Sequence, residues 1–258
     1  NKLKYDSKKG VFMEFDKKLA FRGIRALYGN DGFEKLQNTH VTVIGVGGIG
    51  SWACEALCRT GVGSLTLIDN DTIEITNLNR QLHTTPKTVN QTKVETLATR
   101  LKEINPNIKI ECLCVKLTPE NIDEVLAGKT EYVCECIDDI DAKTYISNYL
   151  HKHKSTFIVA GGAGGRRDPT KLNIGDVSTA NGDALISKLR RELRKSYGFP
   201  NNGQKFNITC TFSTEKPIYS SKEDYISGDL PAFGASMSVT ASAGLLISSW
   251  IINKIVQG

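Results

Sequence analysis

Three closely spaced glycines point to a site that binds phosphate groups. Gly45, Gly47 and Gly50 fit the pattern G-x-G-x-x-G within VTVIGVGGIGS, and Asp69 ends the next apolar stretch. A glycine turn lets backbone N–H groups approach a phosphate, and the helix that follows adds the positive end of its dipole. An acid at the position of Asp69 accepts hydrogen bonds from ribose hydroxyls. This pattern fits a nicotinamide dinucleotide and ATP equally well.

The polar residues that follow Asp69 favour ATP. Arg80 lies just beyond the second apolar stretch, and Lys93 opens the next helical segment. Guanidinium and ammonium groups neutralise the β- and γ-phosphates and the charge that develops on transfer, whereas a nicotinamide site has little use for them. Asp138 follows a later apolar stretch, where its carboxylate can hold Mg²⁺ near the phosphates. In this order, these residues predict an ATP site that leaves the α-phosphate open to attack.

Composition bounds the class of protein. The chain has 258 residues, of which 40% are hydrophobic and 24% charged, as is ordinary for a soluble globular protein. Its net charge of +5 is too small to indicate nucleic acid without a concentrated patch. No two cysteines have C-x-x-C spacing, so a zinc ribbon is excluded, and reduced packing thiols in a cytosolic protein are expected. The seven are Cys54, Cys58, Cys112, Cys114, Cys134, Cys136 and Cys210.

The two ends of the chain carry no clear membrane signal. The lysine-rich residues 1–10 lack the layout of a signal peptide, and we expect a disordered segment or an arm there. The run SMSVTASAGLLISSWIINKIV, residues 236–256, is long enough to span a bilayer but is interrupted by many polar side chains. A buried or subunit-interface helix is the favoured interpretation, and membrane anchoring is the alternative.

Apolar strand-like and helical patterns alternate along the chain, which predicts an α/β fold. We expect a Rossmann-like, doubly wound, mainly parallel sheet with helices on both faces and a C-terminal sheet extension. An arm with helices would occupy residues 1–40, with glycine breaks at Gly29 and Gly32, and one ATP-binding domain residues 41–258. The expected strands are 41–45, 64–69, 108–115, 132–137, 156–160, 171–178 and 207–214. The expected helices after residue 40 are 49–60, 92–104, 118–126 (capped by Thr118), 142–153, 183–198 and 236–256.

The segment GVGGIGSWACEALCRTGVGSLTLIDNDTIEITNLNRQLH resembles the adenylating family that includes ubiquitin-activating enzymes and the ThiF and MoeB proteins. KVETLATRLKEINPN, GGAGGRRDPT, KLRRELRKSYG and CTFSTEKPIY are similar to the branch of tRNA threonylcarbamoyladenosine dehydratases. The resemblance covers about residues 20–256. It implies a homodimer in which Arg22 or Arg25 reaches the partner's ATP site. The nucleotide-binding residues that it implies are Gly45, Gly47, Gly48, Gly50, Asp69, Asp71, Asn77, Arg80, Lys93 and Asp138, with Asp138 on the metal. Glu135 stands where relatives often have Asp.

The same resemblance implies that the carboxylate of N6-threonylcarbamoyladenosine in tRNA is adenylated and that the side chain then closes into a ring with loss of water. Activation of a ubiquitin-like or sulfur-carrier protein is the alternative, although the bacterial relatives that do this carry paired C-x-x-C motifs. A non-catalytic subunit and a hydride-transferring dehydrogenase are disfavoured by Arg80, Lys93 and Asp138.

Two roles remain open for each of a few further residues. Cys210 is either a packing residue or a thiol that carries the activated carboxylate, and His83 either packs or touches the phosphates. A run of basic residues is either a solvated helix face or an RNA-binding patch. That run contains Lys188, Arg190, Arg191, Arg194 and Lys195, together with Arg166 and Arg167.

Overall fold

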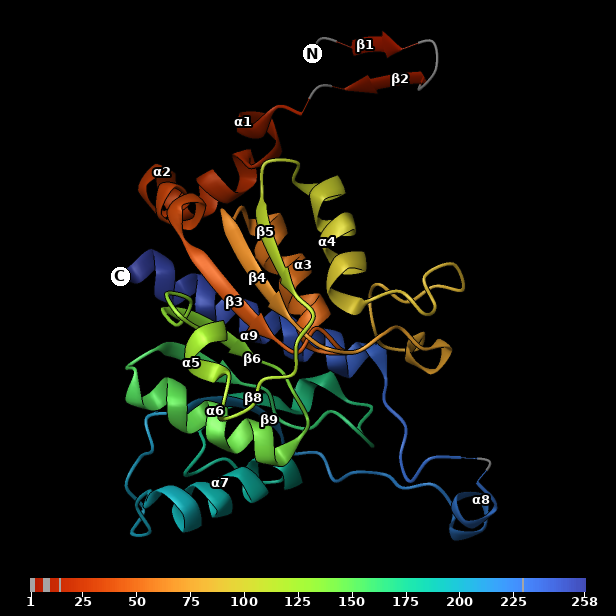
Figure 1. Ribbon diagram of the computed structural model, residues 1–258, viewed down its shortest axis with the longest axis vertical. Helices are drawn as coiled ribbons and strands as arrows, with labels where there is room; N and C mark the ends of the chain where they lie inside the picture. Colours follow the sequence, from red (N-terminus) through yellow and green to blue (C-terminus); the bar gives the residue numbers. More distant parts are fainter. Residues whose placement is uncertain (1–2, 7–9, 14, 229) are drawn as a thin grey trace.

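A single mixed sheet organises the molecule. The computed structural model describes residues 3–6, 10–13, 15–228 and 230–258, and in it the strand order is β5-β4-β3-β6-β7-β9-β8 (Figure 1). All neighbouring strands are parallel except β8 and β9, which confirms the predicted mainly parallel sheet with a C-terminal extension. The strands are β3 (His40–Ile44), β4 (Ser64–Ile68), β5 (Lys109–Leu113), β6 (Tyr132–Glu135), β7 (Thr156–Val159), β8 (Leu172–Asp176) and β9 (Thr209–Ser213).

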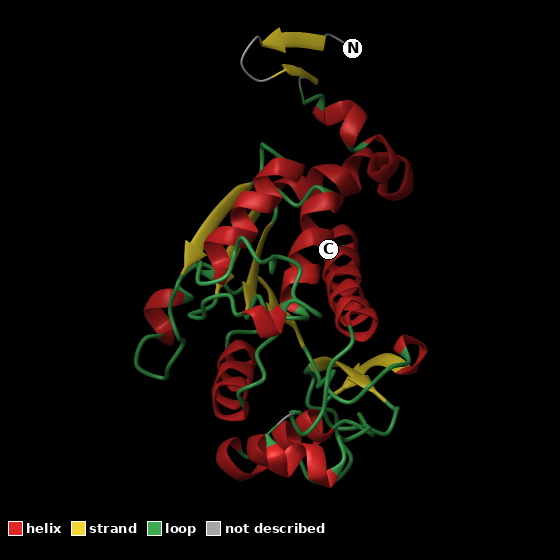
Figure 2. Ribbon diagram, turned by 90° about the vertical axis from the view of Figure 1, so that its right-hand side faces the viewer, coloured by secondary structure: helices red, strands yellow, loops and turns green. Residues whose placement is uncertain are grey.

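Helices cover both faces of this sheet (Figures 1 and 2). Alternate residues of a strand point to opposite faces, so Val43 joins one apolar cluster and Ile44 the other. The first cluster includes side chains of α3 (Gly50–Thr60), α4 (Lys93–Ile104) and α9 (Met237–Gln257). The second includes side chains of α6 (Ile140–Lys152) and α7 (Ala184–Tyr197). Shorter elements are α5 (Ile122–Val125), α8 (Lys222–Ser227), η1 (Ile75–Asn77) and η2 (Pro169–Lys171).

The sheet has a point where the strand order reverses, between β3 and β6. From β3 the chain passes to β4 and β5 on one side, then returns to β6 on the other side of β3. The loops that leave the carboxyl ends of β3 and β6 therefore diverge and leave a crevice, which is where ligands bind in open α/β sheets. The glycine turn follows β3 and Asp138 follows β6, so the fold brings these two predicted features together.

The N-terminal region consists of a hairpin and two helices, of which the second packs against α9 (Figure 1). β1 (Leu3–Asp6) pairs with β2 (Gly10–Met13), and α1 (Lys17–Ala20) and α2 (Arg22–Asn38) follow. Part of the expected disordered segment or arm, residues 1–2 and 7–9, lies outside the described residues. α2 is kinked at Gly29, where φ is 76°, as predicted. The predicted break at Gly32 is wrong, because Gly32 is buried within α2 at a close approach to Val256 of α9.

Two other local predictions are corrected. Thr118 does not cap a helix: α5 begins three residues later than that cap requires, and the side chain of Asn121 accepts a hydrogen bond from the Thr118 N–H at 2.8 Å. Cys114 is exposed because β5 ends at Leu113, so it is not a packing thiol, whereas Cys54, Cys58, Cys134 and Cys210 are buried as expected.

The apolar C-terminal segment forms α9, which packs against α3 and the sheet. It is long and apolar enough to span a membrane, but half of the window that meets this test is buried inside the protein. Gly244 allows the close crossing with α3, since a Cβ there would lie 2.4 Å from the carbonyl oxygen of Ile49. The burial supports the core-helix interpretation over membrane anchoring.

We expect Gly244→Ala to lower the free energy of unfolding by about 1–3 kcal/mol, because the added methyl group would force α9 away from α3. Urea denaturation would measure this. The matched control is Gly23→Ala in the first turn of α2, where the new Cβ would have no neighbour within 4 Å. The free energy of unfolding of this control should equal that of the wild type or exceed it by up to about 1 kcal/mol. Equal stability of Gly244→Ala and the wild type would contradict the close crossing.

Candidate functional site

A cavity of about 1230 Å³ opens at the carboxyl edge of the sheet. Its volume exceeds the roughly 300–1,000 Å³ of an ordinary small-molecule pocket, so it has room for more than one ligand. One half is lined by the loops that follow β3, β4 and β6. The other half is lined by the loop after β7, the start of α7 and residues of the segment before α9.

Some glycines of the turn allow close packing, and some line the cavity. Gly45 has φ of +83°, and a Cβ there would lie 2.8 Å from Cγ2 of Ile137. A Cβ on Gly50 would lie 1.9 Å from the carbonyl oxygen of Gly45, so Gly50 is required for the turn to close. Gly47 and Gly48 line the cavity at the start of α3. Gly45 lines the cavity as well, so three of the four predicted glycines face it, and Gly50 is buried beneath the turn.

Asp69 is oriented by two backbone groups. Its Oδ2 accepts a hydrogen bond from the Val46 N–H at 2.8 Å, and its Oδ1 accepts one from the Asp71 N–H at 2.9 Å. Burial raises the pKa of Asp69, while these donors and the charge of Lys93 oppose the rise. An ionised carboxylate can accept about four hydrogen bonds, so two acceptor positions are left for ribose hydroxyls. Asp69 lines the cavity, as the predicted role requires.

Lys93 brings a positive charge to the cavity wall. The residue is 6% exposed, and its Nζ lies 2.7 Å from Oδ2 of Asp71, whose side chain is 59% exposed. A buried ammonium group needs an anionic partner to offset its lost hydration. Asp71 is that partner, and phosphate oxygens are chemically equivalent acceptors. The predicted position of Lys93 beside the phosphates fits this arrangement.

Arg80 lies against the glycine turn. Its Cγ would be 3.2 Å from a Cβ on Gly48, and its carbonyl oxygen accepts a hydrogen bond from Nε1 of Trp52 at 3.1 Å. Its Nη1 donates to the carbonyl oxygen of Thr76 at 3.1 Å and to Oδ1 of Asn79 at 3.0 Å. These contacts hold the guanidinium group beside the cavity.

Asn77 is buried under the same loop and lines the cavity. Its Oδ1 accepts a hydrogen bond from the Glu74 N–H at 3.1 Å, which closes the capping box of η1. The side-chain oxygen is therefore used to shape the loop that carries Arg80. The side-chain N–H groups of Asn77 could donate hydrogen bonds to a phosphate.

The acid that ends β6, Glu135, and the acid in the loop after it, Asp138, have different surroundings. Asp138 is exposed at the cavity wall, where it can reach a ligand. Glu135 is fully buried, and its Oε2 lies 2.5 Å from Nζ of Lys143. Burial raises the pKa of Glu135, and the ammonium group of Lys143 opposes this. Glu135 thus belongs to an ion pair in the core. It is not among the residues that line the half of the cavity formed by the loops after β3, β4 and β6.

The cavity offers separate exposed acids to a metal rather than a finished metal site: Asp71, Glu74, Asp138 and Asp139 all line it. Across the described ranges, no group of three or more His, Cys, Asp or Glu side chains is arranged to hold a metal ion. Mg²⁺ commonly binds through one or two carboxylates together with substrate phosphates. Asp138, facing the same cavity as Gly47 and Gly48, suits that mode, in which the phosphates complete the coordination.

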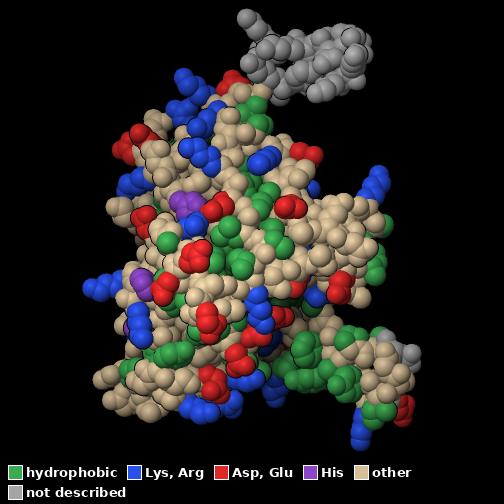
Figure 3. Space-filling model, viewed as in Figure 1, with side chains coloured by type: hydrophobic (Ala, Val, Ile, Leu, Met, Phe, Trp, Pro, Cys, Tyr) green, Lys and Arg blue, Asp and Glu red, His purple; other side chains and the backbone are tan. Residues whose placement is uncertain are grey.

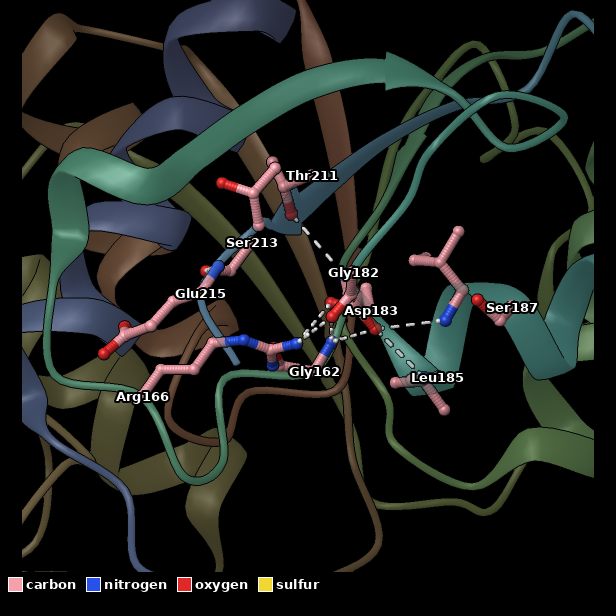
Figure 4. A network of polar contacts seen from close by, with 12 residues as sticks. Gly162, Arg166, Gly182, Asp183, Leu185, Ser187, Thr211, Ser213 and Glu215 are labelled. Carbon is pink, nitrogen blue, oxygen red and sulfur yellow. Dashed lines mark hydrogen bonds and ion pairs between the residues drawn. The ribbon is translucent and has the colours of Figure 1, made fainter. Parts of the chain in front are cut away.

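The second half of the cavity contains residues that sequence analysis missed or misplaced. Arg166 is 5% exposed, so its assignment to a surface patch is wrong. It donates hydrogen bonds to the carbonyl oxygens of Gly162 and Gly182, and its Nη2 lies 3.6 Å from Oδ2 of Asp183 (Figure 4). Asp183 is fully buried at its side chain and also accepts hydrogen bonds from the N–H groups of Gly162 and Leu185. The network ties the glycine-rich loop after β7 to α7.

Known proteins are similar to this chain in sequence and in fold. The model of the ThiF family matches residues 21–256. The chain belongs to the ThiF family. The tRNA threonylcarbamoyladenosine dehydratase of Haemophilus influenzae is 38% identical over 243 residues, which cover 92% of this chain and 93% of that protein.

Two further relatives help to place the chain within the ThiF family. The crystal structure of the Escherichia coli enzyme TcdA in complex with ATP has a TM-score of 0.87 and 34% identity, covering 95% of this chain and 98% of that one. The molybdopterin-synthase adenylyltransferase of H. influenzae is 34% identical over 133 residues, only 52% of this chain and 54% of that protein. The similarity to the dehydratases thus extends through the C-terminal half.

Several predicted residues lie away from the cavity of this ThiF-family chain. Cys210 is fully buried in β9, and burial, with Asp183 and Asp176, raises the pKa of its thiol to about 12. A protonated thiol in the core is a poor nucleophile, which favours the packing role. Arg22 is exposed and Arg25 half-buried on α2, which lies at the opposite end of the strands from the cavity (Figure 1). Neither residue can serve the cavity of its own chain.

The basic run on α7 is only partly available for RNA. Nη1 of Arg190 donates to the carbonyl oxygens of Val177, Ser178 and Ala180, so this residue anchors a turn. Arg194 donates to the carbonyl oxygen of Pro200 and lies over the ring of Phe206. The basic residues that remain exposed are Arg167, Lys188, Arg191 and Lys195.

His83 is a buried residue that is not among those lining the cavity. It is 3% exposed, and neither ring nitrogen has a hydrogen-bond partner among the described residues. Burial, reinforced by the charge of Lys93, lowers the pKa of His83 to about 4. The predicted contact with phosphates is not supported by this position, and the ring is held in its neutral form.

His83 should make stability depend on pH. Its folded-state pKa of about 4 lies below the ordinary value of 6.5, so the unfolded chain binds more protons between these values. The free energy of unfolding therefore falls as the pH is lowered from about 6.5 to about 4, by about 3 kcal/mol from this residue. Urea unfolding across that range should show a shallower fall for His83→Leu, whereas the exposed-site control His153→Leu should keep the wild-type slope. Parallel curves for wild type and His83→Leu would contradict the assignment.

Proposed function

We propose that this protein is an ATP-dependent enzyme that dehydrates N6-threonylcarbamoyladenosine in tRNA by adenylating its carboxylate. The observation that carries the proposal is the continuity of one large cavity, in which a nucleotide half with Asp69, Arg80 and Lys93 adjoins a second half that can take another ligand. Similarity to tRNA threonylcarbamoyladenosine dehydratases over more than nine-tenths of both chains supports it.

The chemistry follows from the poor reactivity of a carboxylate. Direct loss of oxide is unfavourable, so the carboxylate of the threonyl group attacks the α-phosphorus of ATP and pyrophosphate leaves. The ureido group of the same side chain then attacks the acyl carbonyl, AMP leaves and a ring closes. The nucleoside loses the elements of water, which ATP takes up as it becomes AMP and pyrophosphate. The second step is intramolecular and gains from an effective concentration on the order of 10⁵ M or more.

The chain's own residues position ATP and stabilise the leaving group. Gly47 and Gly48 present the start of α3 to the phosphates, and Asp69 holds the ribose. Arg80 and Lys93 offset the charge that accumulates on pyrophosphate. Asp138 would hold Mg²⁺, which would neutralise phosphate charge when bound.

We also propose how the enzyme is assembled. Residues 41–258 form the single adenylating domain, with residues 1–40 as its arm and helices. Two copies form a homodimer in which Arg22 or Arg25 of one chain reaches the ATP site of its partner, consistent with their distance from the cavity of their own chain. Arg167, Lys188, Arg191 and Lys195 contact tRNA phosphates. Seven free cysteines suit a cytoplasmic protein.

Activation of a ubiquitin-like or sulfur-carrier protein uses the same ATP chemistry and is the second candidate. The similarity to a molybdopterin-synthase adenylyltransferase favours it, but that similarity covers about half of each chain. A sulfur-transfer or carrier protein would then be the partner. The two candidates differ in what accepts the adenylate, so the substrate decides between them.

The deciding experiment supplies ATP, Mg²⁺ and tRNA that bears the threonylcarbamoyl modification. The RNA is digested under mild, amine-free conditions and the nucleoside is weighed by mass spectrometry. We expect loss of one water with matching release of AMP. An unchanged nucleoside, with ATP–pyrophosphate exchange appearing only when a small carrier protein is added, would support the second candidate instead.

Asp138→Ala should reduce AMP formation with Mg²⁺ by at least about 10²-fold, because removal of one charge-stabilising group commonly costs this much. The fold should be unaffected, since Asp138 is exposed. Asp141→Ala is the matched control: Asp141 is another exposed acid at the start of α6 and is not among the residues that line the cavity. AMP release at the wild-type rate from Asp138→Ala would remove the metal assignment.

Cys210→Ala should retain most of the dehydratase activity, because a buried, protonated thiol cannot carry the activated carboxylate. The smaller side chain should lower the melting temperature by a few degrees. Activity is measured as AMP release per folded protein, with folding monitored by circular dichroism. A folded but inactive variant would place the thiol in the mechanism.

A further inference from the structure

The outer wall of the cavity is built by two chain segments, 217–220 and 231–235, which we call the two limbs. The Gly165 N–H donates to the carbonyl oxygen of Gly234 at 2.7 Å, and the Ile218 N–H donates to that of Gly165 at 2.7 Å. The limbs are joined to each other by the Ser220 N–H, which donates to the carbonyl oxygen of Ala232 at 3.0 Å. Both limbs are therefore fastened to the glycine-rich loop that follows β7.

An aromatic side chain projects from each limb into this wall. Tyr219 and Phe233 both line the cavity, and their rings meet at 73° with centroids 6.1 Å apart. The Phe233 ring lies directly on the backbone of Gly164, where a Cβ would be 2.3 Å from its Cε2. Tyr219 is 63% exposed and Phe233 47% exposed, so aromatic surface is left open to a ligand. The two rings form a corner that suits a flat, planar ring system.

The loop beneath the corner is held firmly. Arg166 and Asp183 fix Gly162 from both its carbonyl and its N–H side (Figure 4). Oε2 of Glu215 accepts hydrogen bonds from the N–H groups of Arg167 at 3.0 Å and Asp168 at 2.9 Å. This bonding orients the aromatic corner before any ligand arrives.

The corner is also connected to the nucleotide half. Nδ2 of Asn79, the neighbour of Arg80, donates to the carbonyl oxygen of Ala235 at 2.8 Å. The second limb thus ends beside the loop that holds Arg80. In the proposed reaction the carboxylate must reach the α-phosphorus of ATP, so the base that carries it must bind in the adjoining half of the same cavity.

We propose that Tyr219 and Phe233 form the binding site for the purine ring of the modified nucleoside, which stacks on one ring with its edge against the other. This inference rests on the proposed function. Bases of single-stranded RNA are commonly splayed out and stacked on aromatic side chains, which recognise the flat face of a base. Stacking in the corner would present the substituted edge of the purine to the nucleotide half.

A different role for exposed aromatic residues is contact with another protein. The limbs continue into α8, where Tyr225 and Ile226 are also exposed, and apolar side chains gather beside α8 in Figure 3. Tyr225 does not line the cavity, whereas Tyr219 does. The two tyrosines are therefore a matched pair: one faces the proposed nucleoside site and the other only the outer surface.

The test compares Tyr219→Ala, Tyr219→Phe and Tyr225→Ala in steady-state dehydration of tRNA bearing the threonylcarbamoyl modification. We expect Tyr219→Ala to raise the KM for this tRNA on the order of tenfold, which is within the range for loss of one stacking contact. Tyr219→Phe keeps the ring and should keep the KM within about twofold, as should Tyr225→Ala. Equilibrium binding of ATP should be unchanged in all three variants, because Asp69, Arg80 and Lys93 are untouched.

The possible outcomes distinguish a failure of the aromatic-corner proposal from a failure of the proposed function. Dehydration by the wild type with an unchanged KM in Tyr219→Ala would overturn the corner while leaving the function in place. Equal losses in Tyr219→Ala and Tyr225→Ala, with a changed oligomeric state by light scattering, would assign the aromatic surface to a protein contact instead. A wild-type protein that leaves the nucleoside intact while activating a carrier protein would overturn both.

Discussion

The contact between Gly50 and the carbonyl oxygen of Gly45 sets the geometry on which the site depends. The approach is so close that a Cβ at position 50 would lie 1.9 Å from that oxygen. It brings the start of α3 over the end of β3, and the missing Cβ of Gly45 lets Ile137, in the loop after β6, pack against the same turn. Because Gly47 and Gly48 lie between these fixed points, their N–H groups are placed by packing rather than by a ligand.

The charges of the nucleotide half are paired before ATP binds. Lys93 is buried at the cavity wall with only Asp71 as its ion-pair partner among the described residues. Asp69 is held by two backbone N–H groups. A site organised in this way loses little free energy to rearrangement when charge develops in the transition state, which is the physical basis of electrostatic catalysis.

A buried ion pair, Arg166 and Asp183, organises the other half of the cavity. It fastens the glycine-rich loop after β7 to the start of α7, and the limbs with Tyr219 and Phe233 are bonded to that loop. The two halves differ in chemistry: charged groups line the nucleotide half, and aromatic rings line the outer wall. This division suits one ligand that is rich in phosphate and another that is flat.

The sequence by itself determined the sheet, the glycine turn and the positions of Asp69, Arg80, Lys93 and Asp138 at the cavity. Asp69 and Asp138 lie just after strands, Lys93 opens a helix, and Arg80 lies in the loop between β4 and α4, so local order along the chain predicts which edge of a parallel sheet they occupy. Only the tertiary structure decided which arginine side chains remain exposed to solvent. Arg166 is buried while its neighbour Arg167 is exposed, and Arg190 is bound to carbonyl groups while Arg191 faces solvent. It also decided the corner of Tyr219 and Phe233, because the limbs that carry these rings are bonded to each other and to Gly165, a residue far from both in the sequence. Contacts between distant segments leave no periodic signal in the chain, and so they could not be predicted from it.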